Sequence, residues 1–397
     1  MSDAQALTTP PGDLPGWLRL TLAPGLGPAR LRELLTAFGL PQAILAAPSA
    51  ALRHHLPESV LRALLAPPDA ALRTQIERTQ AWMAEAGHYI VTLADQAYPA
   101  NLLALADPPP LLYVCGRLDL LTSPALGIVG ARHATLQGTQ NAEAFAEALS
   151  QAGQTVVSGL ALGIDAAAHT GALRGPGSTV AVIGTGPDIV YPSRNRALTE
   201  HIAAEGVILS EFPLGTPASR FHFPRRNRLI AALGQGVLVV EAALQSGSLI
   251  TARLAAELGR EVFAIPGSIH SPLSKGCHRL LRDGAKLVES AQDIFEELQG
   301  RAAPMDMRRK TRVPGAAETQ STALHPAHAP VSAPPADTSS DTPADPLLAA
   351  LGYDPVTLDA LCERLGHAAS ELSAQLFTLE LAGHIERLPG NVFRRLR

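Results

Sequence analysis

Three patterns of apolar and polar residues follow one another along the chain. In the first 87 residues, apolar side chains recur at helical spacing, as at Leu31, Leu34, Leu35 and Phe38, and proline or glycine separates the segments. This spacing predicts a small helical domain over residues 1–87.

Between residues 88 and 300, short and nearly continuous apolar runs alternate with amphipathic segments. Such runs are typical of strands in a parallel sheet that helices cover on both faces. We therefore predict a doubly wound α/β domain, in which ligands bind beyond the carboxyl ends of the strands. The predicted strands span residues 90–93, 111–114, 126–129, 155–157, 179–183, 207–209, 237–240 and 262–265.

The remaining residues divide into a linker and a small domain. Residues 301–345 are rich in proline, alanine, serine and threonine, which predicts a flexible linker without a core. Residues 346–397 hold two predicted helices, at 357–365 and 369–381, and a hairpin at 384–396. Two helices followed by a hairpin indicate a winged helix domain.

The composition indicates a globular protein of the cytoplasm. Hydrophobic residues make up 46% of the 397 positions and charged residues 17%. Cys115, Cys277 and Cys362 are far apart, which argues against disulfides and zinc sites and favours a reducing compartment. The start of the chain lacks the features of a signal peptide, and polar residues and glycine interrupt the most apolar stretch, residues 229–244. We expect no membrane span.

The strongest local concentration of charge lies at residues 219–228. These ten residues hold four arginines, one histidine and two phenylalanines, in a chain whose net charge is −4. Guanidinium groups bind phosphates in a planar fork, and aromatic rings stack on unpaired bases. The segment therefore favours a loop that binds single-stranded nucleic acid. The alternative is a solvated loop between two elements.

Loops that leave the predicted strands are rich in glycine, small hydroxyl residues and arginine. Gly130 and Arg132 follow one strand, Ser158 and Gly159 follow the next, and Gly184 follows a third. Backbone amides at glycine turns and helix starts bind anions. The carboxyl ends of parallel strands share one edge of a sheet, so we expect several arginines to meet there: Arg132, Arg194, Arg196, Arg225, Arg226 and Arg228.

Residues 22–30, Leu-Ala-Pro-Gly-Leu-Gly-Pro-Ala-Arg, resemble a helix-hairpin-helix turn. In such a turn, glycines let the amides of a helix start approach a DNA phosphate. An ordinary turn between two helices is the alternative.

Signatures of common nucleotide-binding and hydrolytic enzymes are missing from the sequence. Gly184 and Gly186 lack the third glycine of the dinucleotide fingerprint, and neither a P-loop nor a Gly-x-Ser-x-Gly elbow occurs. Asp165 and His169 are four residues apart, which suits an acid–base pair, part of a metal site, or a helix-start carboxylate beside a packed histidine. The alternative function is a nucleotide-processing enzyme, such as a nucleoside monophosphate hydrolase, with Glu241 or Asp165 as acid or base.

Five motifs resemble, in the same order, those of the DNA-processing protein A family (DprA, also called Smf). They lie at residues 130–132, 158–165, 223–228, 241 with 246–252, and 265–267. The resemblance implies a Rossmann-like domain that binds single-stranded DNA, forms a homodimer and loads the RecA recombinase during natural transformation. We therefore expect a recombination mediator without catalytic residues, metal or cofactor.

Carried over position by position, the resemblance implies a DNA site built from Arg132, residues 223–228 and the glycine loops. The chain departs from the usual family pattern at Ala131, His278 and Ser193. With the residues of the neighbouring loops, the predicted DNA-binding set is Gly130, Arg132, Ser158, Gly159, Gly184, Arg194, Arg196, Phe221, Phe223, Arg225, Arg226, Asn227, Arg228, Ser246, Gly247, Ser248 and Lys275.

The second predicted helix of the winged helix domain has no cation. It carries Glu371, Gln375 and Glu380 but neither arginine nor lysine, which disfavours reading of a DNA groove by this helix. Arginines on or after the hairpin leave contact with a DNA backbone open. A protein-binding role is the alternative.

Overall fold

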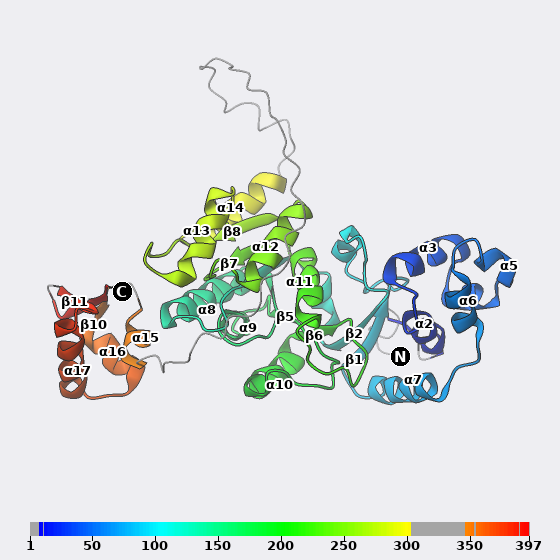
Figure 1. Ribbon diagram of the computed structural model, residues 1–397, viewed down its shortest axis with the longest axis horizontal. Coiled ribbons are helices and arrows are strands. Elements are labelled where there is room, and N and C mark those ends of the chain that lie inside the picture. Colours follow the sequence, from blue (N-terminus) through cyan, green and yellow to red (C-terminus); the bar gives the residue numbers. More distant parts are fainter. Residues whose placement is uncertain (1–7, 11, 303–345, 353–354, 389, 397) are drawn as a thin grey trace, which may run out of the picture.

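The computed structural model describes residues 8–10, 12–302, 346–352, 355–388 and 390–396. Helices come first along the chain, a large α/β unit follows, and a small unit of helices and strands comes last (Figure 1). The predicted linker, residues 301–345, lies almost wholly outside the described residues.

The amino-terminal part is helical, as the apolar spacing predicts. Proline stands at the first position of several of these helices, where its missing N–H costs nothing. Gly25 makes the turn between the first two helices with a φ of +80°. The helices are α2 (Leu14–Thr21), α3 (Pro28–Phe38), α4 (Pro41–Ala46), α5 (Ser49–Leu52), α6 (Glu58–Leu65) and α7 (Ala70–Met83).

The central sheet contains every strand that the sequence predicts. Among the described residues it has nine strands, in the order β1-β2-β6-β5-β4-β3-β7-β8-β9. They are β1 (His88–Thr92), β2 (Leu111–Gly116), β3 (Ala125–Val129), β4 (Thr155–Ser158), β5 (Thr179–Val182), β6 (Val207–Ser210), β7 (Gly236–Val239), β8 (Glu261–Ala264) and β9 (Lys286–Leu287).

The sheet is mixed, which corrects the expectation of a wholly parallel one. β1 pairs antiparallel with β2, and β2 pairs antiparallel with β6. The strands from β6 to β9 are all parallel. The connection from β1 to β2 contains one 3-10 turn, Ala100–Ala104, in place of the α-helical crossover that usually joins parallel strands. β9 escapes prediction because it has only two residues, both exposed.

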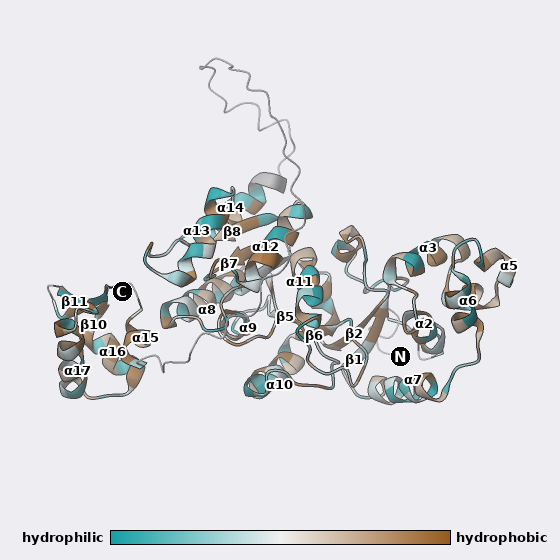
Figure 2. Cartoon of the chain, viewed as in Figure 1, coloured by the Kyte–Doolittle hydropathy of each residue, from teal (hydrophilic) through white to brown (hydrophobic). Residues whose placement is uncertain are grey.

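Helices cover both faces of the sheet, and the alternation of side chains along each strand forms two cores. Val237 and Val239 contribute to one core with α11 and α12, whereas Leu238 contributes to the other with α8 and α9. The strands β7 and β8 are coloured as apolar in Figure 2. The helices are α8 (Leu136–Gln151), α9 (Ile164–Ala172), α10 (Arg196–Glu205), α11 (His222–Leu233), α12 (Gly247–Glu257), α13 (Lys275–Arg282) and α14 (Ala291–Ala302).

The order of the strands places a crevice between β3 and β7. From β3 the chain builds β4, β5 and β6 on one side, and it then returns to add β7 and β8 on the other side. Open α/β sheets bind ligands at such a reversal, beyond the carboxyl ends of the strands. The fold therefore directs attention to the loops after β3, β4 and β7.

The amino-terminal helices pack on the antiparallel edge of this sheet. Trp17 of α2 and Trp82 of α7 share a core with Ile90 and Tyr113 of β1 and β2. This contact buries apolar surface that the edge strands would otherwise expose.

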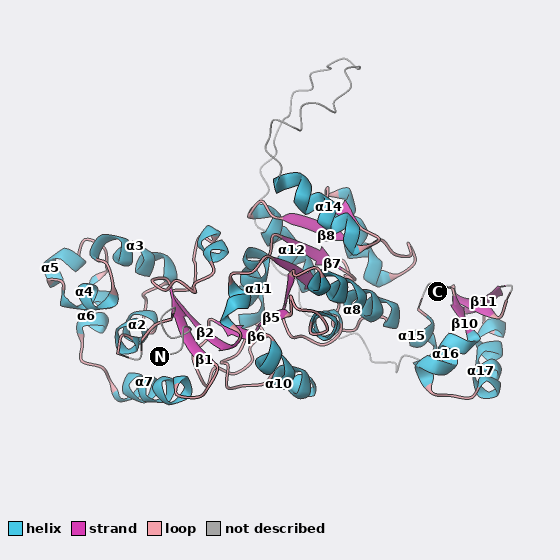
Figure 3. Cartoon of the chain, turned by 180° about the vertical axis from the view of Figure 1, so that it is seen from behind, coloured by secondary structure: helices cyan, strands magenta, loops and turns pink. Residues whose placement is uncertain are grey.

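The carboxyl-terminal part has the predicted winged helix arrangement (Figure 3). The two predicted helices and the hairpin are present, and a short helix and a short strand were not predicted. The elements are α15 (Pro346–Leu351), β10 (Val356–Thr357), α16 (Leu358–Leu365), α17 (Ala369–Leu381), β11 (Ile385–Leu388) and β12 (Val392–Arg395). No helix within the described ranges is long and apolar enough to cross a bilayer.

Candidate nucleic-acid interface

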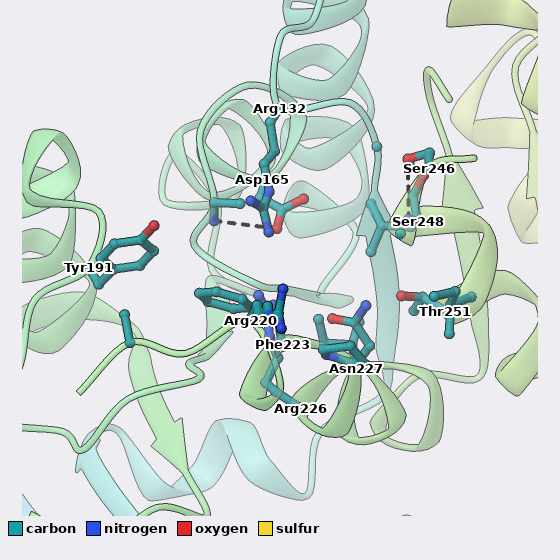
Figure 4. A pocket seen from close by; sticks show the side chains of 18 of the residues that line it. Arg132, Asp165, Tyr191, Arg220, Phe223, Arg226, Asn227, Ser246, Ser248 and Thr251 are labelled. Atoms are coloured by element: carbon teal, nitrogen blue, oxygen red, sulfur yellow. Dashed lines mark hydrogen bonds between the residues drawn. The ribbon is translucent and has the colours of Figure 1, made fainter. Parts of the chain in front are cut away.

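A cavity of about 580 Å³ opens at the crevice between β3 and β7. Residues from the end of β3, the start of α9, the start of α11 and the start of α12 surround it (Figure 4). The lining side chains are cationic, aromatic and small. They include Gly130, Arg132, Ala161, Asp165, Tyr191, Arg220, Phe223, Arg226, Asn227, Ser246, Gly247, Ser248 and Thr251.

The rings of Tyr191 and Phe223 and the guanidinium of Arg132 lie together in this cavity and form an aromatic wall. The Arg132 guanidinium lies 5.2 Å from the centroid of the Phe223 ring, within the range of a cation–π contact. The Tyr191 ring lies 5.7 Å from that of Phe223, tilted by 30°. Behind them, a smaller recess of about 70 Å³ reaches Gly159 and Gly184. The predicted glycine loops at Gly159 and Gly184 therefore adjoin the aromatic wall.

Arg226 is the most unusual side chain of the cavity. The residue is only 4% exposed, its Nε has no hydrogen-bond partner among the described residues, and its guanidinium forms no ion pair there. Burial lowers the pKa of Arg226 to about 10; Asp165 opposes this shift and Arg132 adds to it. A buried cation without a direct counter-ion is costly, so this arrangement favours an anionic ligand.

Gly159 leaves the space that the Arg226 guanidinium occupies. A Cβ atom at this position would lie 1.4 Å from Nη1 of Arg226, and 2.4 Å from its Cζ. Any side chain at position 159 would therefore displace the guanidinium from the cavity.

The pair formed by Asp165 and His169 is structural around His169. The ring of His169 is fully buried, its Nε2 accepts from the Leu160 N–H at 3.2 Å, and its Nδ1 lies 2.7 Å from Thr179 Oγ1. Burial lowers its pKa to about 3, and the charge of Arg226 contributes to the shift. His169 is thus a neutral, packed imidazole with both nitrogens engaged, and Nδ1 carries the proton because Nε2 accepts.

Asp165 itself faces the cavity from the first turn of α9. Its carboxylate accepts from the Ala161 N–H at 3.4 Å, and burial raises its pKa, against the opposing charge of Arg226. Among the described residues, no three histidine, cysteine or carboxylate side chains gather in a way that could hold a metal ion.

The carboxylate of Glu241 is engaged at a helix start rather than in the cavity. It accepts from the backbone N–H of Thr135 at 2.9 Å and from the Thr135 hydroxyl at 2.6 Å, immediately before α8. A Cβ atom at Gly138 would lie 2.3 Å from Cδ of Glu241. An anion at this end of a helix stabilises the helix dipole, so the geometry gives Glu241 a structural contact and no approach to the cavity.

The start of α12 presents backbone amides to the cavity. Ser246 is its N-cap: its hydroxyl accepts from the Ser248 N–H at 3.3 Å, and the two hydroxyl groups lie 2.6 Å apart. Gly247 is exposed, and an added Cβ there would contact nothing within 4 Å. Free amides at a helix start are suited to phosphate.

Residues 222–228 are helical, which corrects the expectation of a loop. Successive residues of an α-helix are turned by about 100°, so the arginines of α11 separate onto two faces. Phe223, Arg226 and Asn227 face the cavity. On the opposite face, Nη2 of Arg225 and Nη2 of Arg228 lie 3.1 and 2.6 Å from Oε2 of Glu211. Neither arginine lines the cavity, so only two of the six arginines that were expected to meet there, Arg132 and Arg226, line it.

The other predicted residues lie around or beneath the cavity without lining it. Ser158 is buried and donates to the Ile128 carbonyl at 2.6 Å. Phe221 is 71% exposed, with the Arg220 guanidinium 4.8 Å from its ring centroid. Lys275 donates to the Ile269 carbonyl. The exposed arginines Arg194 and Arg196 stand on the segment that follows Tyr191.

Sequence reasoning missed several residues of the cavity. Tyr191 stands in a loop that follows a predicted strand, and Arg220 stands in the arginine cluster, so the sequence pointed to the segments of both residues. The contact between the rings of Tyr191 and Phe223 forms only in the folded chain. Thr251 also lines the cavity; it belongs to the motif at residues 246–252, and its place three residues after Ser248 on a helix could have signalled this.

The fold and this cavity define an α/β protein with a Rossmann-like sheet and a cationic site at its crevice. Comparison with known proteins is consistent with that class. A family model described as DNA recombination-mediator protein A matches residues 89–299, and one described as DprA winged helix domain matches residues 331–391.

Individual relatives agree with the family models. Protein Smf of Escherichia coli (strain K12) is 39% identical over 326 residues, which cover 82% of each chain. DNA processing protein DprA of Bacillus subtilis (strain 168) is 39% identical over 278 residues, which cover 68% of this chain and 94% of the relative. The X-ray structure of DprA from Streptococcus pneumoniae aligns with a TM-score of 0.63 at 36% identity, covering 73% of this chain and 98% of that one. The chain belongs to the DprA/Smf family.

Proposed function

We propose that this protein binds single-stranded DNA in the cavity between β3 and β7 and acts as a recombination mediator. The observation that carries the proposal is Arg226: a buried cation that forms no ion pair with any residue the structure describes, in a cavity that also holds Arg132 and an aromatic wall. The family description, DNA recombination-mediator protein A, supports the same function.

The phosphates of the strand would bind to guanidiniums and backbone amides. Arg132 and Arg226 supply fixed charge, and the start of α12 supplies the backbone N–H of Gly247. Gly159 leaves room for the Arg226 guanidinium, Gly184 leaves room for the ring of Phe223, and Gly130 packs closely against Ile164. The cavity thereby gathers cationic and dipolar groups from three separate loops.

The bases would stack on the aromatic wall. Phe223 and Tyr191 present ring faces beside Arg132, and stacking of a base on such a ring contributes about 1 to 3 kcal/mol. A paired base cannot reach a wall inside a cavity, so this geometry favours an unpaired strand. Phe221, which is largely exposed, would extend the same surface outside the cavity.

Residues outside the cavity would guide the strand toward it. Arg194, Arg196 and Lys275 carry exposed charge near the carboxyl edge of the sheet, and we assign them backbone contacts of smaller effect. Ser158 has no exposed atom to offer a ligand, so its role in the site is to hold β3 and β4 together.

The partners follow from the family. We propose that the protein forms a homodimer and passes DNA to the RecA recombinase during natural transformation in the cytoplasm. We also propose that it is not an enzyme: of the two candidate acids or bases, Glu241 is engaged by Thr135 outside the cavity, and Asp165 accepts from the Ala161 N–H and interacts with the charge of Arg226.

Fluorescence anisotropy with labelled oligonucleotides tests the DNA-binding proposal. The full chain should bind oligothymidine more tightly than a duplex of equal length, and Arg132→Ala should weaken binding of every sequence. Arg53→Ala is a matched control, because it removes the same charge from an exposed ion pair with Glu58, 3.3 Å apart, in the helical domain. Equal affinity for both DNA forms, or equal effects of the two variants, would contradict the proposal.

A further inference from the structure

Glu211 is a buried carboxylate that contacts the face of α11 opposite the cavity. It lies directly after β6, and its side chain is 1% exposed. Its Oε2 lies 3.1 Å from Nη2 of Arg225 and 2.6 Å from Nη2 of Arg228. Nε of Arg228 also lies 3.5 Å from Oδ2 of Asp107, whose side chain is about half exposed. One buried carboxylate therefore forms ion pairs with both arginines on this face of α11.

This ion pair fixes α11 more firmly than a surface pair would. The side chain of Arg228 is only 9% exposed, so both partners have left water. Breaking a buried pair by removing one partner strands the other charge in a medium of low polarity. Burial raises the pKa of Glu211, and the charges of Arg228 and Arg225 oppose the rise. The pair thus has one favoured geometry, in which each charge meets its counter-ion.

The same contacts decide which arginine faces the cavity. Arg225 and Arg226 are adjacent in sequence, and a turn of α11 by about 100° about its axis would point Arg226 in the direction that Arg225 now has. Such a turn would bring Arg226 toward Glu211 and remove it from the cavity. Further contacts hold the helix in its present setting: Asn101 Nδ2 donates to the Leu233 carbonyl at 3.0 Å at its carboxyl end. At its start, His222 Nδ1 lies 3.2 Å from the Gly184 carbonyl oxygen.

We propose that Glu211 is a positioning residue for the DNA site. It takes up Arg225 and Arg228, sets the rotation of α11, and so directs Arg226 and Phe223 into the cavity. Arg225 and Arg228 are then structural cations rather than phosphate ligands. This inference rests on the proposed binding of single-stranded DNA. It gives Glu211 an indirect role in that binding, because Glu211 would not contact the DNA.

The sign of the effect distinguishes positioning from simple electrostatics. Removing a negative charge near a site for a polyanion should, by Coulomb attraction alone, strengthen binding. Loss of a positioning contact should weaken it. In the full chain, Glu211→Gln should lower the affinity for labelled oligothymidine about tenfold or more, as loss of an outer-shell contact does at other sites. The slope of log affinity against log salt should stay unchanged, because no phosphate contact is deleted.

Arg225→Gln provides a second variant that keeps the buried Arg228–Glu211 pair intact. The side chain of Arg225 is half exposed, so the variant should fold even where Glu211→Gln does not. We expect its salt slope to equal that of the unmodified protein, whereas a phosphate ligand would lower the slope by about 0.7. Circular dichroism at the temperature of the binding assay confirms that each variant is folded.

The outcomes separate this inference from the function on which it depends. Absence of oligothymidine binding by the unmodified chain would refute the proposed function. Binding by the unmodified chain that Glu211→Gln leaves equal or tighter would refute the positioning role alone. A lower salt slope in Arg225→Gln would also refute it, because Arg225 would then be a phosphate ligand.

Discussion

Helix α11 of the central sheet and helix α17 of the winged helix part are of similar length, and they present opposite surfaces. α11 carries three arginines and no acidic residue, and most of its carboxyl-terminal half is buried. α17 carries Glu371 and Glu380, no basic residue, and two large apolar side chains in solvent: Phe377 is 60% exposed and Leu381 74%. The helix that a winged helix domain commonly uses for DNA is therefore the one without cations, and the DNA site that we propose lies elsewhere.

The comparison shows that the counter-ion of a cation within the protein, more than the number of cations, decides whether that cation is available to a ligand. On α11, the two arginines that meet a buried acid are neutralised within the protein, and the one that meets a glycine is free for a phosphate. α17 shows no such division of its side chains, because it has no cation that a buried acid could hold or a cavity could receive. Substitutions at and around these two helices should test this difference, with effects that decrease from Gly159→Ala to changes on α17.

Gly159→Ala should have the largest effect, because it displaces Arg226, the arginine of α11 that we propose binds phosphate. The added Cβ would overlap Nη1 of Arg226, so the guanidinium must leave the cavity. We expect the affinity for single-stranded DNA to fall by about 100-fold, as when a 1 Å displacement disrupts a site. Anisotropy measures this loss. Gly247→Ala is the control, since a Cβ there has free space and the backbone amide is retained; an equal loss in both variants would contradict the role of Arg226.

Arg226→Ala deletes the cation and leaves the backbone unchanged. Loss of a charge-assisted contact to phosphate should weaken binding by about 1.5 to 2.5 kcal/mol, or roughly 10- to 70-fold, for all sequences. Removal of an unpaired buried charge should also leave the protein as stable or more stable to urea. Weaker DNA binding together with a large drop in stability would show instead that Arg226 is a structural residue.

The dependence of stability on pH tests whether the imidazole of His169 is buried and neutral in the folded protein. Its folded pKa is about 3, against an ordinary value of 6.5, so between these values the unfolded chain takes up a proton that the folded protein does not. The free energy of unfolding should therefore fall as the pH drops below 6.5, by at most about 1.4 kcal/mol per pH unit from this residue.

Urea unfolding of the His169→Gln variant measures that contribution. The variant should show a shallower decline of stability between pH 6.5 and pH 4 than the unmodified protein. His54→Gln, which removes an exposed imidazole, is the control. Equal slopes in the unmodified protein and in His169→Gln would contradict a buried, neutral His169.

The double variant Phe377→Ser, Leu381→Ser should have the smallest effect on DNA. Both side chains are exposed, so stability should change by less than about 0.5 kcal/mol for each, and the affinity for single-stranded DNA should stay within about twofold. Anisotropy and thermal unfolding measure the two quantities. A loss of affinity comparable to that of Arg226→Ala would place a DNA contact on α17 and end the contrast between the two helices.

Much of the fold could be predicted because apolar runs mark buried strands directly. The direction of β1 and β2 could not, since an apolar run is the same whichever way a strand lies. Residues 222–228 were interpreted as a loop because Pro224 and the dense charge obscure a helix; helical spacing would have placed Arg226 and Arg225 on different faces. The engagement of Glu241 by Thr135, and of two arginines by Glu211, joins residues far apart in the sequence, and only the folded chain brings them together.

The salt dependence of DNA affinity in Arg226→Ala tests the central claim most directly. For single strands, each phosphate contact contributes about 0.7 to the slope of log affinity against log salt. If Arg226 is a phosphate ligand, the slope should be smaller by about that amount in the variant than in the unmodified protein. Parallel lines with equal affinity would contradict the claim that this buried guanidinium binds the DNA backbone.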